Sequence, residues 1–316
     1  MLDTVEKKVL SKNVLLPAYI CESVIQPFYD RGYNCLFYDI NDNLNLSIDI
    51  KDYESKKIGI FLHLGYFGFP TNANIKNQIQ ILKSNGTFIV EDITHSMFSK
   101  HERYPETDFY FGSIRKWFGT PGGGFLASCH HDLIEPKLKN DRFTQLRKEA
   151  LLIKRQYMDS KIDEMKLKNR FLEKFAEAER ILDDDTNIYQ LDDLSYDMIL
   201  QFNYEDLISK RRENYLYLAN NLQKLNNLIV VFKELDAGTC PLFLPVIIKE
   251  NRDEIRAKLA NHKIYCPIHW PIHSMYAAKS FKHSYMMYNK GLSIPCDQRY
   301  GIADMKKIVS VIKSII

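Results

Sequence analysis

The stretch from Gly86 to Ser128 constrains the fold of this chain more than any other. It contains three short, mainly apolar runs, at 87–90, 109–111 and 125–128, and polar residues follow the first two. Glu91 and Asp92 come directly after the first run, and Ser113 comes shortly after the second. Short apolar runs bounded by turn residues are typical of buried strands in a parallel sheet. Because ligands bind outside the carboxyl ends of such strands, the sequence predicts an α/β sheet with a site at that edge.

The residue types at these strand ends indicate a pyridoxal 5'-phosphate (PLP) site. Lys116 lies three positions after Ser113, and Gly123-Gly124 precedes the third run. A lysine amine forms a Schiff base with the cofactor aldehyde and then carries protons, which makes Lys116 the candidate catalytic residue. A carboxylate such as Asp92 keeps the pyridine nitrogen protonated, and the Ser113 hydroxyl can donate to the phosphate. Each residue alone has an ordinary structural explanation, so the hypothesis depends on their order and spacing.

Several further motifs give the chain a resemblance to the DegT-type sugar aminotransferases of the fold type I, aspartate aminotransferase superfamily. These motifs are 15–19 (LLPAY), 63–68 (HLGYFG), Glu91-Asp92-x-x-His95, the lysine with the glycine pair, and 292–300 (LSIPCDQRY). The resemblance runs from about Val14 to the C-terminus and is weakest between His130 and Ser195. It implies a mostly parallel central sheet flanked by helices, with a smaller α+β C-terminal domain.

The function implied by this resemblance is a PLP-dependent aminotransferase that moves an amino group from an amino acid to a nucleotide-linked keto-sugar. It also implies a homodimer and places His95 and Tyr19 at the cofactor. Substrate contacts are expected from His269 and Trp270, and from the residues His63 and Tyr66. Two alternatives remain open: another PLP reaction on the same scaffold, or a non-catalytic, scaffolding descendant with weakened cofactor binding.

The sequence departs from the family pattern at two places near its start. The family provides a Ser-Gly-type segment whose backbone N–H groups hold the phosphate, whereas the thirteen residues before Val14 contain no glycine. We therefore expect this phosphate cup to be lacking, through a shortened start, a different way of holding the phosphate, or loss of tight cofactor binding. The position where the family has an aromatic ring that stacks on the cofactor is Cys21, and Tyr19 is the candidate replacement.

Cys266-x-x-His269-x-x-x-His273 has residue types and spacing compatible with a metal site. Pro267 and Pro271 interrupt the motif, and a fourth ligand is not evident nearby. Lining of the substrate cleft, which the resemblance implies, and ordinary packing are the other two interpretations. We expect no metal in this protein.

Composition bounds the class of protein. The chain has 316 residues, of which 45% are hydrophobic, and its formal net charge is +3 from 43 basic and 40 acidic residues. This balance argues against a nucleic-acid partner. No apolar run approaches the length of a membrane span, and the six cysteines lack a pairing pattern, so we expect a cytoplasmic protein without a membrane partner.

The pattern of apolar residues predicts three parts: a PLP-binding domain at 1–130, a helical segment with an inter-domain helix at 131–226, and an α+β domain at 227–316. The charged, helical stretch 131–185 is interpreted either as packed helices with solvated outer faces or as a docking arm or cover. Further elements are predicted as helices at 1–12 and 195–226 and as strands at 34–40 and 264–266.

Overall fold

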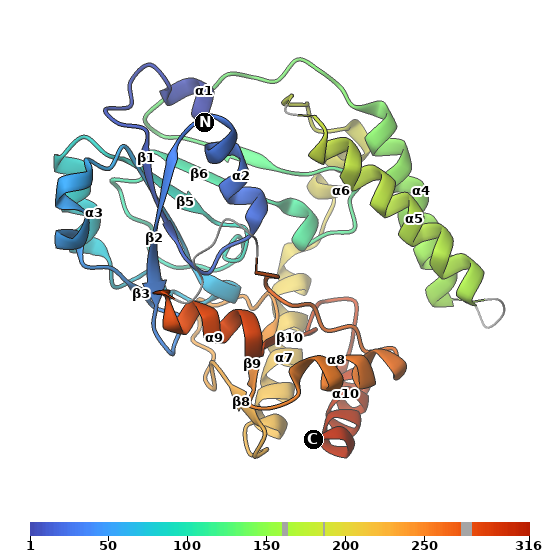
Figure 1. The fold of residues 1–316 in the computed structure, drawn as a ribbon. Helices are drawn as coiled ribbons and strands as arrows, with labels where there is room; N and C mark the ends of the chain where they lie inside the picture. Colours follow the sequence, from blue (N-terminus) through green and yellow to red (C-terminus); the bar gives the residue numbers. More distant parts are fainter. Residues whose placement is uncertain (160–163, 186, 273–279) are drawn as a thin grey trace.

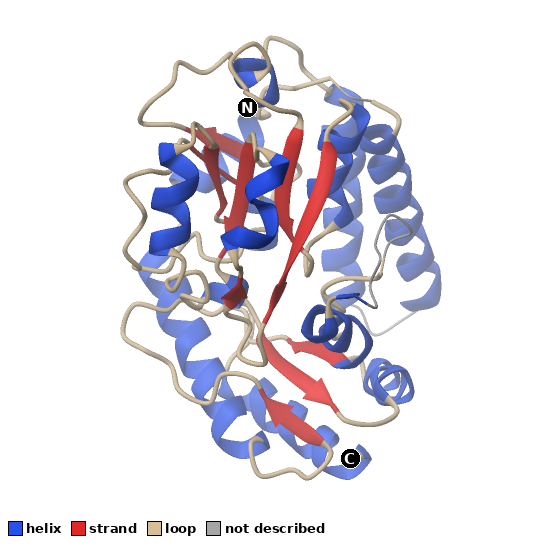
Figure 2. Ribbon diagram, turned by 60° about the vertical axis from the view of Figure 1, so that its left-hand side comes forward, coloured by secondary structure: helices blue, strands red, loops and turns tan. Residues whose placement is uncertain are grey.

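The computed structural model describes residues 1–159, 164–185, 187–272 and 280–316. A seven-stranded sheet forms the body, and a three-stranded sheet lies beside it in the C-terminal part (Figures 1 and 2). The large sheet has the order β3-β2-β1-β4-β5-β6-β7, in which the edge strands β3 and β7 are antiparallel to their neighbours and the five central strands are parallel. The strands are β1 (Asn13–Pro17), β2 (Asn34–Ile40), β3 (Leu46–Ser47), β4 (Ile60–Leu64), β5 (Phe88–Asp92), β6 (Phe109–Gly112) and β7 (Phe125–Ala127).

The apolar runs form the predicted strands because both faces of the central sheet are covered. Every residue of β4 is buried, and β5 is buried from Ile89 to Asp92. Helices α2 (Glu22–Asp30) and α3 (Lys76–Ser84) cross between strands and pack on the sheet through Ile25, Phe28, Ile79 and Leu82. The predicted fold class, a mostly parallel sheet flanked by helices, is therefore confirmed.

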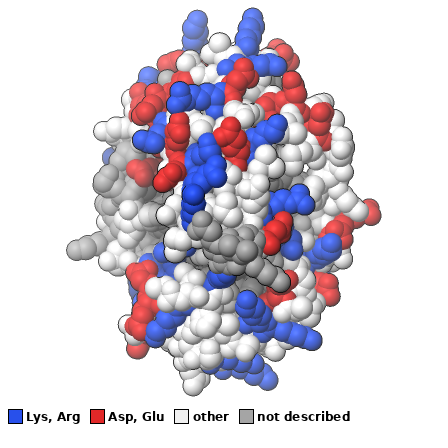
Figure 3. All heavy atoms as spheres, turned by 90° about the vertical axis from the view of Figure 1, so that its right-hand side faces the viewer, with Lys and Arg blue, Asp and Glu red and all other residues white. Residues whose placement is uncertain are grey.

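The charged stretch after the large sheet forms an antiparallel hairpin of two long helices, α4 (Asp141–Asp159) and α5 (Glu164–Asp183), which extends along one side of the body (Figure 1). Their facing sides bury Ile153, Tyr157 and Phe171. Basic and acidic side chains lie interspersed on the face of the molecule shown in Figure 3. The prediction of helices is confirmed, and the buried seam favours packed helices with solvated outer faces.

The C-terminal part contains an antiparallel sheet of order β10-β9-β8, made of β8 (Leu228–Val230), β9 (Leu244–Ile248) and β10 (Gly291–Ile294). Helices α8 (Arg252–Asn261), α9 (Lys282–Lys290) and α10 (Ile302–Ile315) accompany it. The long helix α7 (Tyr204–Leu222) runs from the lower side of the body down along this sheet, where it contacts β8, β9 and α10 (Figure 1). One continuous apolar core contains residues of both sheets, such as Leu15 and Phe61 from the large one and Val246 and Ile294 from the small one.

Three predicted elements are wrong or too long. Helix α1 covers only Leu2–Val5, because just these two apolar side chains find a buried place while Leu10 stays exposed. The single helix predicted at 195–226 is two helices, α6 (Asp193–Leu200) and α7, and the Asn203 side chain caps the second. Residues 264–266 alternate in burial as a strand would, yet they form no strand, and β10 pairs with β9 instead.

Candidate active site

The candidate site lies where β5 and β6 end side by side. Asp92 is the last residue of β5 and pairs in register with Phe111 of β6, so the polar residues after both strands reach the same edge. Lys116 closes a single turn of 3-10 helix, Ile114–Lys116, that follows β6. Burial raises the pKa of Asp92 to about 6, although hydrogen bonds from Thr94 oppose the rise. The structure thus brings the predicted amine and carboxylate to one place.

Thr94 connects the parts of this edge. Its backbone N–H donates to Asp92 Oδ1 at 2.8 Å, and its hydroxyl oxygen accepts from the backbone N–H of Ser113 at 3.0 Å. Its carbonyl accepts from the indole N–H of Trp117 at 2.7 Å. Thr94 was not among the predicted site residues, although a Thr two residues after an Asp is a known signal for a side-chain-stabilised turn. The Ser113 hydroxyl does not cap the following turn, which leaves it available to a ligand.

The Lys116 side chain is exposed, and its ammonium makes no hydrogen bond or ion pair with the described part of the chain. Its positive charge nevertheless lowers the pKa values of Asp92, His95 and His269, in each case as a smaller effect than burial. One charge that acts on all three groups must lie close to them. Lys116 therefore lies near the cluster described next.

Histidine and aromatic rings form a wall around His95, which lies three residues after Asp92 in the chain. The rings of His95 and Trp270 are stacked, with centroids 5.4 Å apart and an interplanar angle of 21°, and His269 meets His95 edge-on at 5.6 Å. Tyr19 contacts Trp270 at 5.1 Å. Burial lowers the pKa of His269 to about 3 and that of His95 well below its ordinary value, so both imidazoles are neutral. Phe67 donates its backbone N–H to His95 Nδ1, which leaves the other ring nitrogen of His95 to carry the proton.

The remaining predicted residues separate into two groups. Tyr66 joins the aromatic wall, because its hydroxyl donates to the Tyr19 carbonyl at 2.5 Å and the two rings lie 5.3 Å apart. His63 lies apart from it: its Nδ1 is 3.0 Å from Asn72 Nδ2, and it pairs in register with the buried Glu91, which forms an ion pair with Arg103. The structure therefore groups Tyr19, Tyr66, His95, His269 and Trp270, and it places His63 in a separate polar cluster.

The described residues contain no group of three or more His, Cys, Asp or Glu that could hold a metal ion. Burial raises the pKa of the Cys266 thiol to about 12, and His269 Nδ1 lies 2.7 Å from the Ser293 hydroxyl. His273, the third residue of the Cys-His motif, lies outside the described residues.

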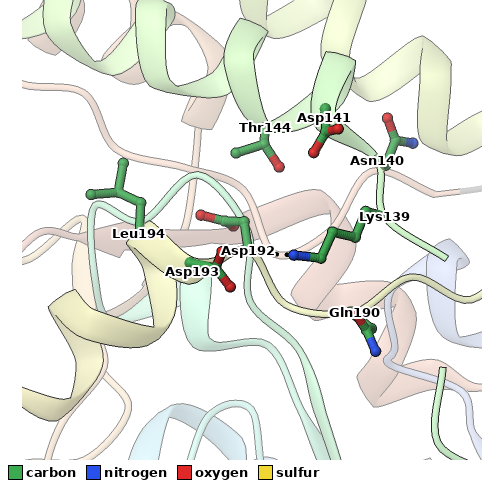
Figure 4. Close-up of a pocket in the computed structure, with 8 residues that line it drawn as sticks. All are labelled: Lys139, Asn140, Asp141, Thr144, Gln190, Asp192, Asp193 and Leu194. Carbon is green, nitrogen blue, oxygen red and sulfur yellow. Dashed lines mark ion pairs between the residues drawn. The ribbon is translucent and has the colours of Figure 1, made fainter. Parts of the chain in front are cut away.

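A separate pocket of about 210 Å³ lies between the start of α4 and the start of α6 (Figure 4). Lys139 and Asp193 face each other there at 3.7 Å, with both side chains more than half exposed. Its lining holds none of the residues grouped around Asp92, and such exposed charges are usual for a solvated surface. We therefore place the candidate site at the strand ends.

The donor set at the strand ends fits PLP. Asp92 provides a buried carboxyl group for a cationic ring nitrogen. Lys116 provides an exposed amine for an aldehyde, and Ser113 provides a hydroxyl group, not used as a helix cap, for a phosphate oxygen. The neutral rings of His95 and His269 lie near enough to feel the Lys116 charge. The fold and this set of side chains are those expected of a fold type I PLP-dependent protein.

Comparison with known proteins agrees with this class. The model of the DegT/DnrJ/EryC1/StrS aminotransferase family matches residues 198–313, which confirms the resemblance predicted from the sequence. No curated protein sequence matches the chain. The match to a family of aminotransferases supports the predicted enzyme class, a PLP-dependent transaminase.

Solved structures share the fold at low sequence identity. A DegT DnrJ EryC1 StrS aminotransferase from Brucella abortus is 16% identical, with a TM-score of 0.63 over 99% of this chain and 81% of that chain. The sugar aminotransferase CalS13 from Micromonospora echinospora is 15% identical, with a TM-score of 0.62 over 96% and 80%. Spr1654 from Streptococcus pneumoniae, in its PLP form, is 13% identical, with a TM-score of 0.67 over 100% and 84%.

Proposed function

We propose that this protein is a PLP-dependent aminotransferase that transfers an amino group from an amino acid to a nucleotide-linked keto-sugar. The observation that carries the proposal is the meeting of Lys116 and Asp92 at the ends of neighbouring strands, with Thr94 joining the two segments. The family match over residues 198–313 supports the reaction type. The sugar acceptor rests on the resemblance to the sugar aminotransferases.

Each residue has a distinct task in this proposal. The Lys116 amine bonds the cofactor aldehyde and later takes and returns the substrate proton. The Asp92 carboxylate holds the ring nitrogen in its protonated form, so that the bound cofactor supplies an electron-accepting ring. Ser113 donates to the phosphate, while His95 and Tyr19 flank the ring. His269 and Trp270, with Tyr66 and His63, are proposed to contact the substrates.

The proposal also covers the oligomeric state and the cellular location of the protein. The resemblance implies a homodimer, and the cysteine pattern predicts a cytoplasmic location, which agrees with six unpaired cysteines in the structure. Among the described residues no helix has the length and apolar character needed to cross a membrane.

The first experiment measures the visible absorption of the purified chain after incubation with PLP and desalting. We expect a retained band that disappears in Lys116→Ala and persists in Lys100→Ala, a second exposed lysine as the matched control. A band of equal size in wild type and Lys116→Ala would contradict the assignment of Lys116. The absence of a retained band in the wild type would favour the non-catalytic alternative.

The second experiment separates the proposed reaction from other PLP chemistry. The loaded protein is given an amino acid and a nucleotide-linked keto-sugar, and the products are identified by mass. An amino-sugar together with a 2-oxo acid is expected. Loss of carbon dioxide or of a substituent, without amine transfer, would identify another PLP reaction instead.

A further inference from the structure

Trp117, the residue after Lys116, is fixed far more firmly than the lysine itself. Its side chain is buried, and its indole N–H donates to the Thr94 carbonyl. Its own carbonyl accepts from Gln298 Nε2 at 2.8 Å, across 181 positions of sequence. Because the Lys116 side chain has no such partner in the described structure, the backbone at Trp117 decides where the amine can reach.

Gln298 is in turn held by Arg211 of α7. Arg211 Nε donates to Gln298 Oε1 at 2.7 Å, and its Nη1 donates to the carbonyls of Pro241 and Leu242 at 3.2 and 2.9 Å. The guanidinium carbon also lies 4.6 Å from the centroid of the Trp117 ring. Arg211 therefore contacts Trp117 on its ring face and, through Gln298, on its backbone.

The burial of Arg211 calls for an explanation. Its side chain is 2% exposed, and no carboxylate among the described residues forms an ion pair with it. A buried cation without an ion-pair partner costs stability. Hydrogen bonds to carbonyls compensate in part, and so does the charge of the buried Asp297, which opposes the lowering of the Arg211 pKa by burial. One turn further along α7, Asn214 donates to the carbonyls of Asp297 and Tyr300 and so fixes the loop that carries Gln298. These contacts connect α7 to the 3-10 turn that ends at Lys116.

We propose that Arg211 and Gln298 are positioning residues that hold the Lys116 turn in register with Asp92. The inference rests on the proposed function, because it concerns the amine that meets the cofactor aldehyde. The guanidinium holds the side-chain amide of Gln298 in one orientation, and that amide fixes the Trp117 carbonyl. A lysine at this position cannot do the same, since it lacks the planar fork that serves ring, amide and carbonyls together.

The test follows the bonding of PLP to Lys116 directly rather than through turnover. Wild type, Gln298→Ala and Arg211→Lys are incubated with PLP, reduced with borohydride at timed intervals, and digested, so that mass analysis gives the rate of modification at Lys116. The circular dichroism of the cofactor band, per mole of cofactor bound, reports how rigidly the ring is held. Arg212→Lys is the matched control, because Arg212 is the next residue of α7 and bonds the carbonyls of Asp236 and Thr239 instead of Gln298.

We expect Gln298→Ala and Arg211→Lys to slow the modification of Lys116 on the order of tenfold, since small displacements of a reacting group have effects of this size or larger. The circular dichroism per bound cofactor is expected to fall in both variants and to stay unchanged in Arg212→Lys. If Gln298→Ala does not fold, Gln298→Glu tests the same link, because it keeps an acceptor for Arg211 and loses the N–H donor to Trp117.

Two results would overturn the inference. One is an unchanged rate and unchanged circular dichroism in folded Gln298 and Arg211 variants. The other is an equal loss in Arg212→Lys, which would make the effect one of general stability. A wild-type protein that is not modified at Lys116 at all would instead contradict the proposed function, and the inference would fall with it.

Discussion

Replacing Asp92 with asparagine should stabilise the protein in the absence of cofactor at neutral pH. Burial raises the pKa of Asp92 from an ordinary 3.8 to about 6, so above pH 6 the folded protein holds a carboxylate that is better solvated in the unfolded chain. The interval between these two pKa values corresponds to about 3 kcal/mol of unfolding free energy. Asparagine has nearly the same shape and no charge, so Asp92→Asn removes this penalty.

The sign of the pH dependence makes the prediction specific. As the pH falls from 6 to 3.8, the folded protein takes up the proton first, so the penalty in the wild type disappears over this window. The gain from Asp92→Asn should therefore be up to about 3 kcal/mol at pH 7.5 and less than about 1 kcal/mol near pH 4. Urea unfolding of both proteins, followed by far-UV circular dichroism at the two pH values without PLP, measures the difference.

Asp297→Asn provides a control of opposite sign. Burial raises the pKa of Asp297, but hydrogen bonds and charge from Arg299 lower it more, and the net pKa lies below its ordinary value. The same substitution there should lower stability at pH 7.5, with an effect that fades as the pH falls through the pKa of the folded protein. An Asp92→Asn gain that is independent of pH, or a loss of stability at pH 7.5, would refute the reasoning.

Three further predictions concern groups around the site. Thr94→Val removes the acceptor of the Ser113 N–H and should cost about 1–3 kcal/mol of unfolding free energy in urea titrations, whereas an unchanged midpoint would show that water replaces the hydroxyl. Arg103→Met leaves the buried Glu91 without its ion-pair partner and should cost about 3–5 kcal/mol, a loss that Glu91→Gln in the same chain should partly restore. With a pKa of about 3, His269 should show no titration of its ring NMR signals between pH 5 and 8, and a midpoint near 6.5 would contradict its burial as a neutral ring.

The position of Asp92 and Lys116 could be predicted because it follows from strand ends. In a parallel sheet the carboxyl ends of adjacent strands meet at one edge, so the order of residues along 86–128 was sufficient to bring the two side chains together. The pattern of apolar runs also predicted the bounds of β2 at Asn34–Ile40 as the structure has them. Local sequence decides these features most clearly at β4 and β5, where the apolar runs are buried almost throughout.

The strand predicted at 264–266 is wrong because the alternating burial of these residues has another cause. Ile264 and Cys266 are buried and Tyr265 is exposed, which matches a strand. Within residues 264–267, however, only the Pro267 carbonyl forms a backbone hydrogen bond with β10, accepting from Ser293 N–H. Lys263, just before, has a positive φ of 61°, which turns the chain away from an extended path. The alternating burial at 264–266 therefore results from how this loop packs. Only the hydrogen-bonded pairing with β9 shows that the strand is β10.

The contacts that orient the lysine turn could not be predicted from local patterns. Thr94, Gln298 and Arg211 reach this turn through carbonyl and amide groups of residues distant in the chain, and no spacing rule connects positions 117 and 298. Arg211 in particular lies in a run of charged residues that reads as a solvated helix face, yet it is among the most buried side chains of the protein.

These contacts change how the predicted parts of the chain should be understood. The division into 1–130, 131–226 and 227–316 assigns the cofactor residues to the first part alone, and this division stays a prediction. In the structure, the Trp117 carbonyl depends on Gln298 near the C-terminus and, through it, on Arg211 of the inter-domain helix. The apolar core also runs through both sheets without a break. Because the lysine turn is fixed by residues from all three stretches, a movement of the C-terminal sheet relative to the large one would displace the amine from Asp92, and the reactivity of Lys116 should report on the packing of the whole chain.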